Sequence, residues 1–466
     1  MSHAVVDKAS PDVVARLKAS GSENWQALLF LAVGLIFSMQ TILGMLPLNI
    51  AVVYRTDGIA GTFGAMFAPV LVVGWVVWRI DYTSPQRWLL LGVLAVANFG
   101  LQVTGMMADP RGVGLISKII LSPLATSYFN DALQIQDIST WLSHFHQASL
   151  TLHAVSHPPG AIVFCWLMIK LFGPVLGSWV CGCALGLAGA AGVLVVYQFA
   201  GLWTGDPKSR LLASAIYALT PALVVFFPEF DQGYAVLSMY LMLLWSRTLA
   251  SVDSGKWQKH AILLGTVIFA ASFFAYQILS IGVFLVFCAL HWLHQHSFRL
   301  AVFPRLLGAA GVAFAVCACI YASLWLATGY NVIASFLHGV AETNRYLVTT
   351  TSTPYRVYNF YVFAMGLGGM AVPIFLVHAN REFNRFRDNR DCIPFTLIAL
   401  GSLILIDLTG FFAGETDRDW LFLAPLIAVP VAMELARLTW RWRLVLFAMQ
   451  GWILVCLKAK ISFIEP

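Results

Sequence analysis

Apolar runs of about 20 residues recur along the chain from Ala27 onward, and no other feature constrains the fold as strongly. Of the 466 residues, 59% are hydrophobic and only 11% are charged. Runs of this length can cross the hydrocarbon core of a bilayer as helices, and a soluble domain would be less apolar. We therefore expect an all-α, polytopic integral membrane protein.

The apolar runs predict about 13 or 14 transmembrane helices, with residues 261–292 forming one long helix or two short ones. The expected spans are roughly 27–53, 59–78, 88–107, 160–173, 175–203, 211–227, 233–250, 261–292, 306–328, 358–378, 393–412, 421–436 and 444–457. Residues 25–466 would then form a single membrane domain, without internal repeats.

Residues 1–24 are polar and include Lys8, Arg16 and Lys18. Because no small-residue cleavage site precedes the first apolar run, we expect a cytosolic N-terminal segment rather than a cleavable signal peptide. The stretch PDVVARLKA within it is typical of a short interfacial helix.

Basic residues beside the apolar runs predict the orientation, since Lys and Arg concentrate in cytosolic loops. The strongest marker is HANREFNRFRDNR at 378–390, and Arg79 and Arg87 mark another inside loop, as do Arg437, Arg441 and Arg443. With a cytoplasmic N-terminus, the outside segments are 108–157, 329–357 and 413–420. The HPPG segment at 157–160 and the FPEFDQ segment at 227–232 would both lie outside, which requires an even number of membrane crossings between them. The sequence has three apolar runs there, so the topology between 158 and 232 stays open.

Several function classes find no support. The net charge of +6 reflects the basic loops, so we expect no nucleic-acid partner. The cysteines lie mostly within apolar runs, form no CxxC pair, and are expected to be small buried hydrophobes. The chain has no Walker loop, no GxGxxG motif before a strand and no nucleophile elbow, so an activated substrate would come from a lipid carrier.

One polar stretch, residues 109–157, interrupts the apolar pattern with acids, histidines and aromatics. Polar groups near membrane depth are costly, which makes this stretch a candidate functional site. In SYFNDA, Asp131 is either a general base or cation ligand, or a first-turn acid that favours the helix dipole. In HAVSHPPG, His153 and His157 share a helix face and either bind metal, phosphate or sugar, or mark a plain junction before a membrane helix.

Two further acidic motifs follow. In FPEFDQ, Glu229 and Asp231 either need partners between membrane helices or lie in a solvated turn. In GETDRDW, Arg418 either binds a substrate phosphate, with Glu415 as a further substrate-binding residue, or the motif forms an internal ion network beside an interfacial Trp. The outside segment 329–357 mixes basic and aromatic residues as a lipid-phosphate site would need; they are His338, Glu342, Asn344, Arg345, Tyr346, Tyr355 and Arg356.

These motifs together resemble the GT-C superfamily of polyprenyl-phosphate-sugar-dependent membrane glycosyltransferases. The resemblance covers roughly residues 88–436 and depends on YFNDA, HPPG, FPEFD and GETDRDWLFLAP. The chain departs from the family pattern because two additional apolar runs precede the acidic loop, and because no large soluble C-terminal domain follows.

The resemblance implies that Asp131 is the catalytic base or a metal ligand, with Asp109 as the weaker candidate. It implies that Glu229 or Asp231 assists and that Arg418, with Arg345, binds the lipid phosphate. The expected partners are the bilayer, a polyprenyl-phosphate-sugar donor and a glycan, lipid or protein acceptor, at a bacterial plasma membrane. Dependence on a divalent metal ion stays open.

Two other functions are weighed against this one. A transporter or flippase of a lipid-linked or small polar substrate would place charges within the spans, where only Lys170 and Asp407 stand out. A non-enzymatic scaffold in envelope assembly would not need such a density of acids and histidines outside.

Overall fold

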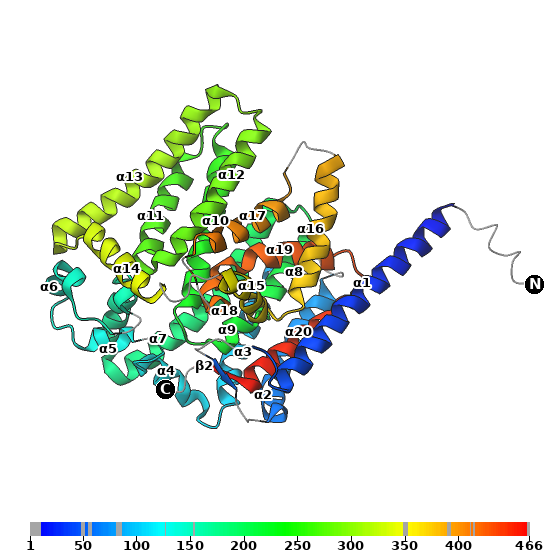
Figure 1. Cartoon of the computed structure of the whole chain (residues 1–466), viewed down its shortest axis with the longest axis horizontal. Coiled ribbons are helices and arrows are strands. Elements are labelled where there is room, and N and C mark those ends of the chain that lie inside the picture. The colour runs from blue at the N-terminus through cyan, green and yellow to red at the C-terminus, as the bar shows by residue number, and fades with distance from the viewer. Residues whose placement is uncertain are drawn as a thin grey trace, which may run out of the picture.

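The computed structural model of the chain is built almost entirely of helices (Figure 1). It describes residues 11–47, 52–54, 58–80, 86–125, 127–151, 154–347, 353–388, 393–410, 412 and 415–463. Within these ranges the strands are β1 (Val52–Tyr54) and β2 (Ile461–Phe463), which pair antiparallel with Val52 opposite Phe463. The expected all-α class is therefore confirmed, apart from this short ribbon.

The two ends of the chain pack together. Helix α20 (Trp440–Lys460) lies against α1 (Pro11–Ile42) and α2 (Ile59–Arg79), and α2 also packs on α3 (Arg87–Met107) (Figure 1). The N-terminal polar segment is not a separate interfacial helix, because α1 runs without a break from Pro11 into the first apolar run. That run ends its helix at Ile42, which is earlier than the expected span 27–53.

The stretch between α3 and the HPPG motif is helical, as expected. Its elements are η2 (Gly112–Gly114), α4 (Leu115–Leu121), α5 (Tyr128–Leu133), α6 (Ile138–Ser143), η3 (Phe145–Gln147) and η4 (Ala154–Ser156). Asp137 caps α6 by accepting a hydrogen bond from the Thr140 amide at 2.7 Å. A helix this short leaves its first N–H and last C=O groups without partners inside the helix, so caps such as Asp137 satisfy part of the backbone of this polar stretch.

The middle of the chain contains one long helix followed by broken ones. Helix α7 (Gly160–Trp203) has 44 residues and an interruption at Gly173, whose φ of 75° no ordinary helical residue adopts. The expected span 211–227 is instead two helices, α8 (Pro207–Ala218) and α9 (Pro221–Val225), of 12 and 5 residues. Helix α10 (Asp231–Ser251) then begins directly after the FPEF turn.

Helices α11 to α13 project together from the rest of the body (Figure 1). They are α11 (Gln258–Phe274), η5 (Tyr276–Ile281), α12 (Gly282–Gln295), η6 (Leu300–Val302) and α13 (Phe303–Thr328). Gly265 permits close packing of α11 on α13, because a Cβ there would lie 2.3 Å from the Ala313 carbonyl oxygen. The expected run 261–292 is divided into α11 and η5–α12, because the backbone of Ala275 between them is extended.

The remaining helices are α14 (Val332–Leu347), α15 (Thr353–Leu367), α16 (Ala371–Asp388), α17 (Phe395–Leu408), α18 (Thr416–Asp419), η7 (Trp420–Leu423) and α19 (Ala424–Leu435). They include α18 and η7, which carry the GETDRDW motif, and α15, which packs on α18. Gly368 and Gly369 have positive φ, and α15 and α16 meet there at a bend of 110°.

Among the described residues, seven helices are long and apolar enough to cross a membrane, or up to eight if each bent pair is one span. These lengths and compositions are those of a multi-pass integral membrane protein. The count is lower than the 13 or 14 spans expected from sequence, because runs such as 211–227 and 421–436 are divided into short helices.

Candidate functional site

Arg418 gathers carboxylates from two distant parts of the chain. From α18 its guanidinium lies 3.7 Å from Asp231 at the start of α10, 2.5 Å from Glu415 and 3.8 Å from Asp419. The charge of Glu229 also interacts with Arg418, Asp231 and Glu415. We call Glu229, Asp231, Glu415, Arg418 and Asp419 the Arg418 cluster. Its formation brings together two of the motifs predicted from sequence.

A buried tryptophan fixes α18 in place. Trp420 is fully buried and contacts Phe360, Phe363 and Phe412 at ring-centroid distances of 5.5, 5.4 and 6.0 Å. Gly366 allows α15 to approach, since a Cβ there would lie 2.6 Å from the Asp417 carbonyl oxygen. The interfacial position that one of the two interpretations gave this Trp is wrong, because its ring is buried inside the protein.

Tyr128 brings the first polar stretch to the same place. Its ring contacts Phe230 and His157 at centroid distances of 5.1 and 5.7 Å. The charges of Asp231, Arg418 and Glu229 all act on its hydroxyl, and burial with the nearby acids raises the pKa of Tyr128 far above its ordinary value. Motifs YFNDA, HPPG, FPEFD and GETDRDW thus meet around Tyr128 and Arg418.

The beginning of α10 is held by amide side chains. Gln277 on η5 donates a hydrogen bond to Asp231 at 3.2 Å. Gln232, the residue after Asp231, donates hydrogen bonds to the Leu223 carbonyl at 2.7 Å and to the Gln102 side chain at 3.3 Å. Gln102 in turn donates to the Asn98 side chain at 2.8 Å. This chain of buried amides connects α3 and α9 to the first turn of α10, so the position of Asp231 is fixed from several helices.

The two acids of FPEFDQ are buried, and this excludes the solvated-turn interpretation of that motif. Glu229 is 2% exposed, and burial raises its pKa against the opposing effect of Arg418. Burial also raises the pKa of Asp419, and raises that of Asp417 to about 7. One arginine cannot neutralise all these carboxyls in a water-poor site, so some of them hold a proton near neutral pH.

Asp131 lies one helical turn after Tyr128 but has other partners. Its carboxylate accepts hydrogen bonds from the Thr151 hydroxyl at 2.8 Å and the Thr151 amide at 3.3 Å. Burial raises the pKa of Asp131, and the bonds from Thr151 counteract that rise. Among the described contacts, Asp131 is bound by the end of the polar stretch rather than by the Arg418 cluster.

Two predicted site residues lie in other ion pairs. Asp109 forms a two-bond salt bridge with Arg111, at 2.9 and 3.2 Å. Arg345 pairs with Glu342 within α14 and its side chain is 74% exposed. His153 lies outside the described residues. Asp109 and Arg345 thus have partners close by in the sequence, and neither pairing includes Arg418.

The described residues do not form a metal site. No three His, Cys, Asp or Glu side chains among them are placed to bind one ion. The Arg418 cluster is an ion-pair and hydrogen-bond network.

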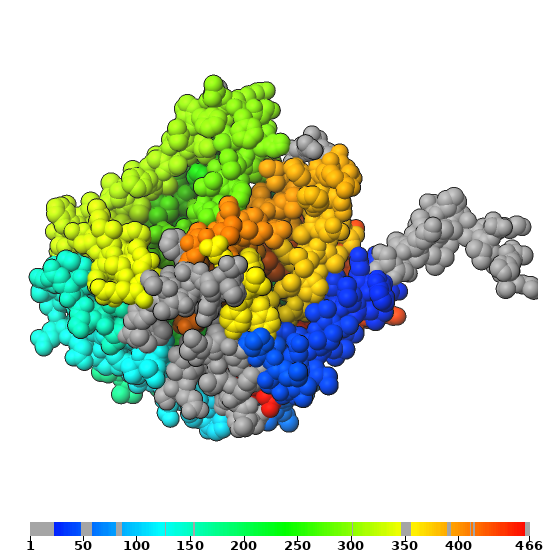
Figure 2. All heavy atoms as spheres, viewed as in Figure 1, coloured from blue at the N-terminus to red at the C-terminus, as the bar shows by residue number. Residues whose placement is uncertain are grey.

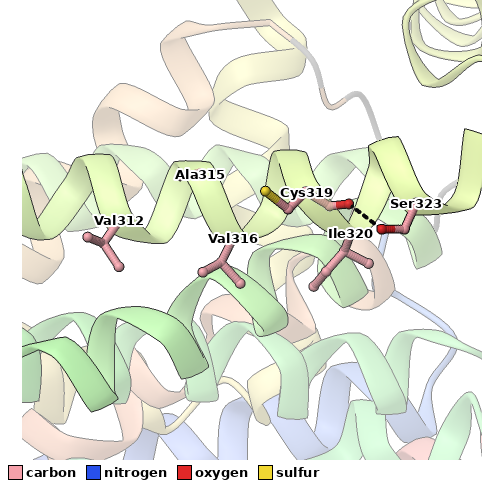
Figure 3. Close-up of a pocket in the computed structure, with 6 residues that line it drawn as sticks. All are labelled: Val312, Ala315, Val316, Cys319, Ile320 and Ser323. Atoms are coloured by element: carbon pink, nitrogen blue, oxygen red, sulfur yellow. Dashed lines mark hydrogen bonds between the residues drawn. The ribbon is translucent and has the colours of Figure 1, made fainter.

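One hollow on the surface is lined by none of these residues. It has a volume of 330 Å³ and lies along α13, where the side chains of Val312, Val316 and Ile320 point to one side (Figure 3). Ser323 donates a hydrogen bond to the Cys319 carbonyl at 2.8 Å in the same region. Cys319 itself is exposed, unlike the buried cysteines expected from sequence. This apolar lining offers no acid–base chemistry.

Two residues of the site were not predicted from sequence. Tyr128 stands within a motif chosen for Asp131, whereas Gln277 stands in a run that was interpreted only as a span. A glutamine within the apolar run 261–292 is the one signal that could have indicated Gln277.

Comparison of the chain with protein-family models, with curated proteins and with solved structures finds no match.

We predict that Asp417→Asn makes stability less dependent on pH. The pKa of Asp417 is about 7 in the folded protein against an ordinary 3.8, so the folded state retains a proton that the unfolded chain has released between these values. Stability of the wild type therefore falls as pH rises through this window, by up to about 1.4 kcal/mol per pH unit from this group, and levels off above pH 7. The Asp417→Asn substitution would remove that contribution, because the amide does not titrate.

The measurement is the thermal unfolding midpoint in detergent from pH 4.5 to 7.5. Asp137→Asn is the matched control, because hydrogen bonds from Thr140 lower the pKa of exposed Asp137 and move its titration below the window. Equal pH slopes for wild type and Asp417→Asn would contradict the prediction.

Proposed function

We propose that this chain is a GT-C-like glycosyltransferase that moves a sugar from a polyprenyl-phosphate donor to a hydroxyl acceptor. In this proposal the protein lies in a bacterial plasma membrane, with about 13 or 14 membrane helices and a cytoplasmic N-terminus. The reaction takes place at the outer face of that membrane. The observation that supports it best is the meeting of four motifs around Tyr128 and Arg418.

The proposed reaction needs a base and a group that receives the leaving phosphate. Asp131 would accept the proton of the acceptor hydroxyl while that oxygen bonds to the anomeric carbon of the sugar. The bond from that carbon to the phosphate oxygen breaks, and polyprenyl phosphate leaves with the electron pair. Burial raises the pKa of Asp131, which brings it closer to the working pH and makes it a better base.

Arg418 would bind the phosphate by exchanging one carboxylate for another anion. Of its partners, Glu415 has the more exposed side chain, at 34%, whereas the side chain of Asp231 is 9% exposed. A phosphate that replaces Glu415 would keep the planar guanidinium paired throughout. Asp231 would hold Arg418 in position during that exchange.

A transporter or flippase is the second candidate. The burial of Glu229, Asp231 and Asp417 favours it, since ionisable groups within membrane proteins often mark proton or substrate paths. A carrier would move its substrate across sealed vesicles without chemical change, so the two candidates differ in their products.

Asp131→Asn should remove transferase activity by about 100-fold or more while leaving the protein folded, because the amide cannot accept the proton. The assay is sugar transfer from a polyprenyl-phosphate-linked donor, with the thermal unfolding midpoint as the folding check. Asp137→Asn serves as the control in the same polar stretch. Full activity of Asp131→Asn would refute the assignment of the base.

Glu415→Gln should tighten binding of polyprenyl phosphate, since it removes the carboxylate that competes for Arg418. Arg418→Lys should weaken binding because an ammonium cannot form the two-bond contact, and Asp131→Asn should leave it unchanged. Binding would be measured with purified protein in detergent. Weaker binding by Glu415→Gln would count against the exchange. Absence of binding by all forms, together with uptake by sealed vesicles, would favour the transporter.

A further inference from the structure

Helix α14 leaves three apolar side chains exposed on one face. Ile333, Phe336 and Leu337 are 69%, 41% and 61% exposed, and their spacing puts them on that face. Phe336, the least exposed of the three, also packs one edge of its ring against Tyr276 at a centroid distance of 5.2 Å. The opposite face contains Ser335 and Gly339, both buried. A helix on a water-exposed surface has the reverse arrangement, with its apolar stripe toward the core.

The inward face of α14 is fixed by specific contacts. The Ser335 hydroxyl is hydrogen-bonded to the hydroxyls of Tyr276 and Tyr330, at 2.9 and 3.0 Å. Gly339 packs so closely that a Cβ would lie 2.9 Å from the Tyr276 ring and 3.2 Å from the Ser156 carbonyl oxygen. Rotation that buried the apolar stripe would break these contacts, so the stripe faces outward in the folded chain.

The exposed apolar surface continues from a helix that is long enough to span a membrane. Helix α13 exposes Phe314 by 74% and Leu326 by 78%, and it ends at Gly329 in a left-handed conformation. Helix α14 begins three residues later and lies on the surface between α13 and the cyan helices of the first polar stretch (Figures 1 and 2). The lipid that covers a spanning helix would therefore also reach α14.

We propose that α14 lies in the boundary between bilayer and water, with Ile333, Phe336 and Leu337 against the acyl chains of phospholipids. The exposed Arg345, near the C-terminal end of the helix, fits the polar side of that boundary. Sixteen residues of this composition suit a helix in the membrane plane. Through Gly339 and Ser156, the helix connects the bilayer surface to the peptide before His157.

The test uses the full chain in vesicles of phosphatidylethanolamine and phosphatidylglycerol. The photoreactive residue benzoylphenylalanine replaces Leu337, and covalent capture of radiolabelled phospholipid is measured after illumination. Phe314 on α13 is the matched lipid-facing position, and the exposed polar Gln136 before α6 gives the background. All three side chains are exposed, so the replacements should not prevent folding.

We expect lipid capture at position 337 comparable with that at 314 and several-fold above that at 136. Capture at 337 no higher than at 136, while 314 labels strongly, would overturn the proposal. Cross-linking of position 337 to a second copy of the chain instead of lipid would also overturn it, because the stripe would then be a protein interface. None of these outcomes depends on sugar transfer.

Discussion

The ion pair between Arg418 and Asp231 is the interaction on which the candidate site depends. It joins the short helix α18 to the first residue of α10, and both side chains are nearly excluded from solvent. A buried charge without an opposite charge beside it costs several kcal/mol, so removal of Arg418 leaves buried Asp231 in an unfavourable state, whereas Arg418 without Asp231 keeps Glu415 and Asp419. Glu415 and Asp419 extend the network, and Tyr128 links it to the first polar stretch. The four motifs therefore meet in one place, through ion pairs at Arg418 and ring contacts at Tyr128.

The broken helices explain how such a unit fits among apolar spans. Where α8 gives way to α9, the freed Ala218 and Leu223 carbonyls accept hydrogen bonds from Asn98 and Gln232. The amide side chains of Asn98 and Gln232 are connected through Gln102, and Gln232 follows Asp231 in the first turn of α10. On the other side Trp420 and Gly366 allow α15 to pack tightly on α18. Irregular backbone at membrane depth is tolerated where it is enclosed by protein in this way.

The sequence was sufficient to predict the helical membrane class and the motifs that carry charge. Hydropathy depends on composition alone, and it was enough to recognise the runs that form α2, α3 and α13. Composition does not show where a helix breaks, so the division of 211–227 at Leu219 and Thr220 was missed. Glu229, Asp231 and Arg418 were chosen for their chemistry, but their pairing depends on tertiary contacts between residues almost 190 positions apart. Arg345 and Asp109 have partners three and two residues away, and sequence motifs alone could not separate them from the cluster. The inverted polarity of α14 became evident only once its packed face was known.

A double-mutant cycle between Asp231 and Arg418 tests the central claim most directly. The free energies of unfolding of wild type, Asp231→Asn, Arg418→Gln and the double variant would be measured in detergent by denaturant titration. If the two side chains form the pair on which the site depends, the double variant should lose less stability than the sum of the single variants, by about 1 kcal/mol or more. Additive losses within about 0.3 kcal/mol would mean that the two groups do not interact, and would contradict this account.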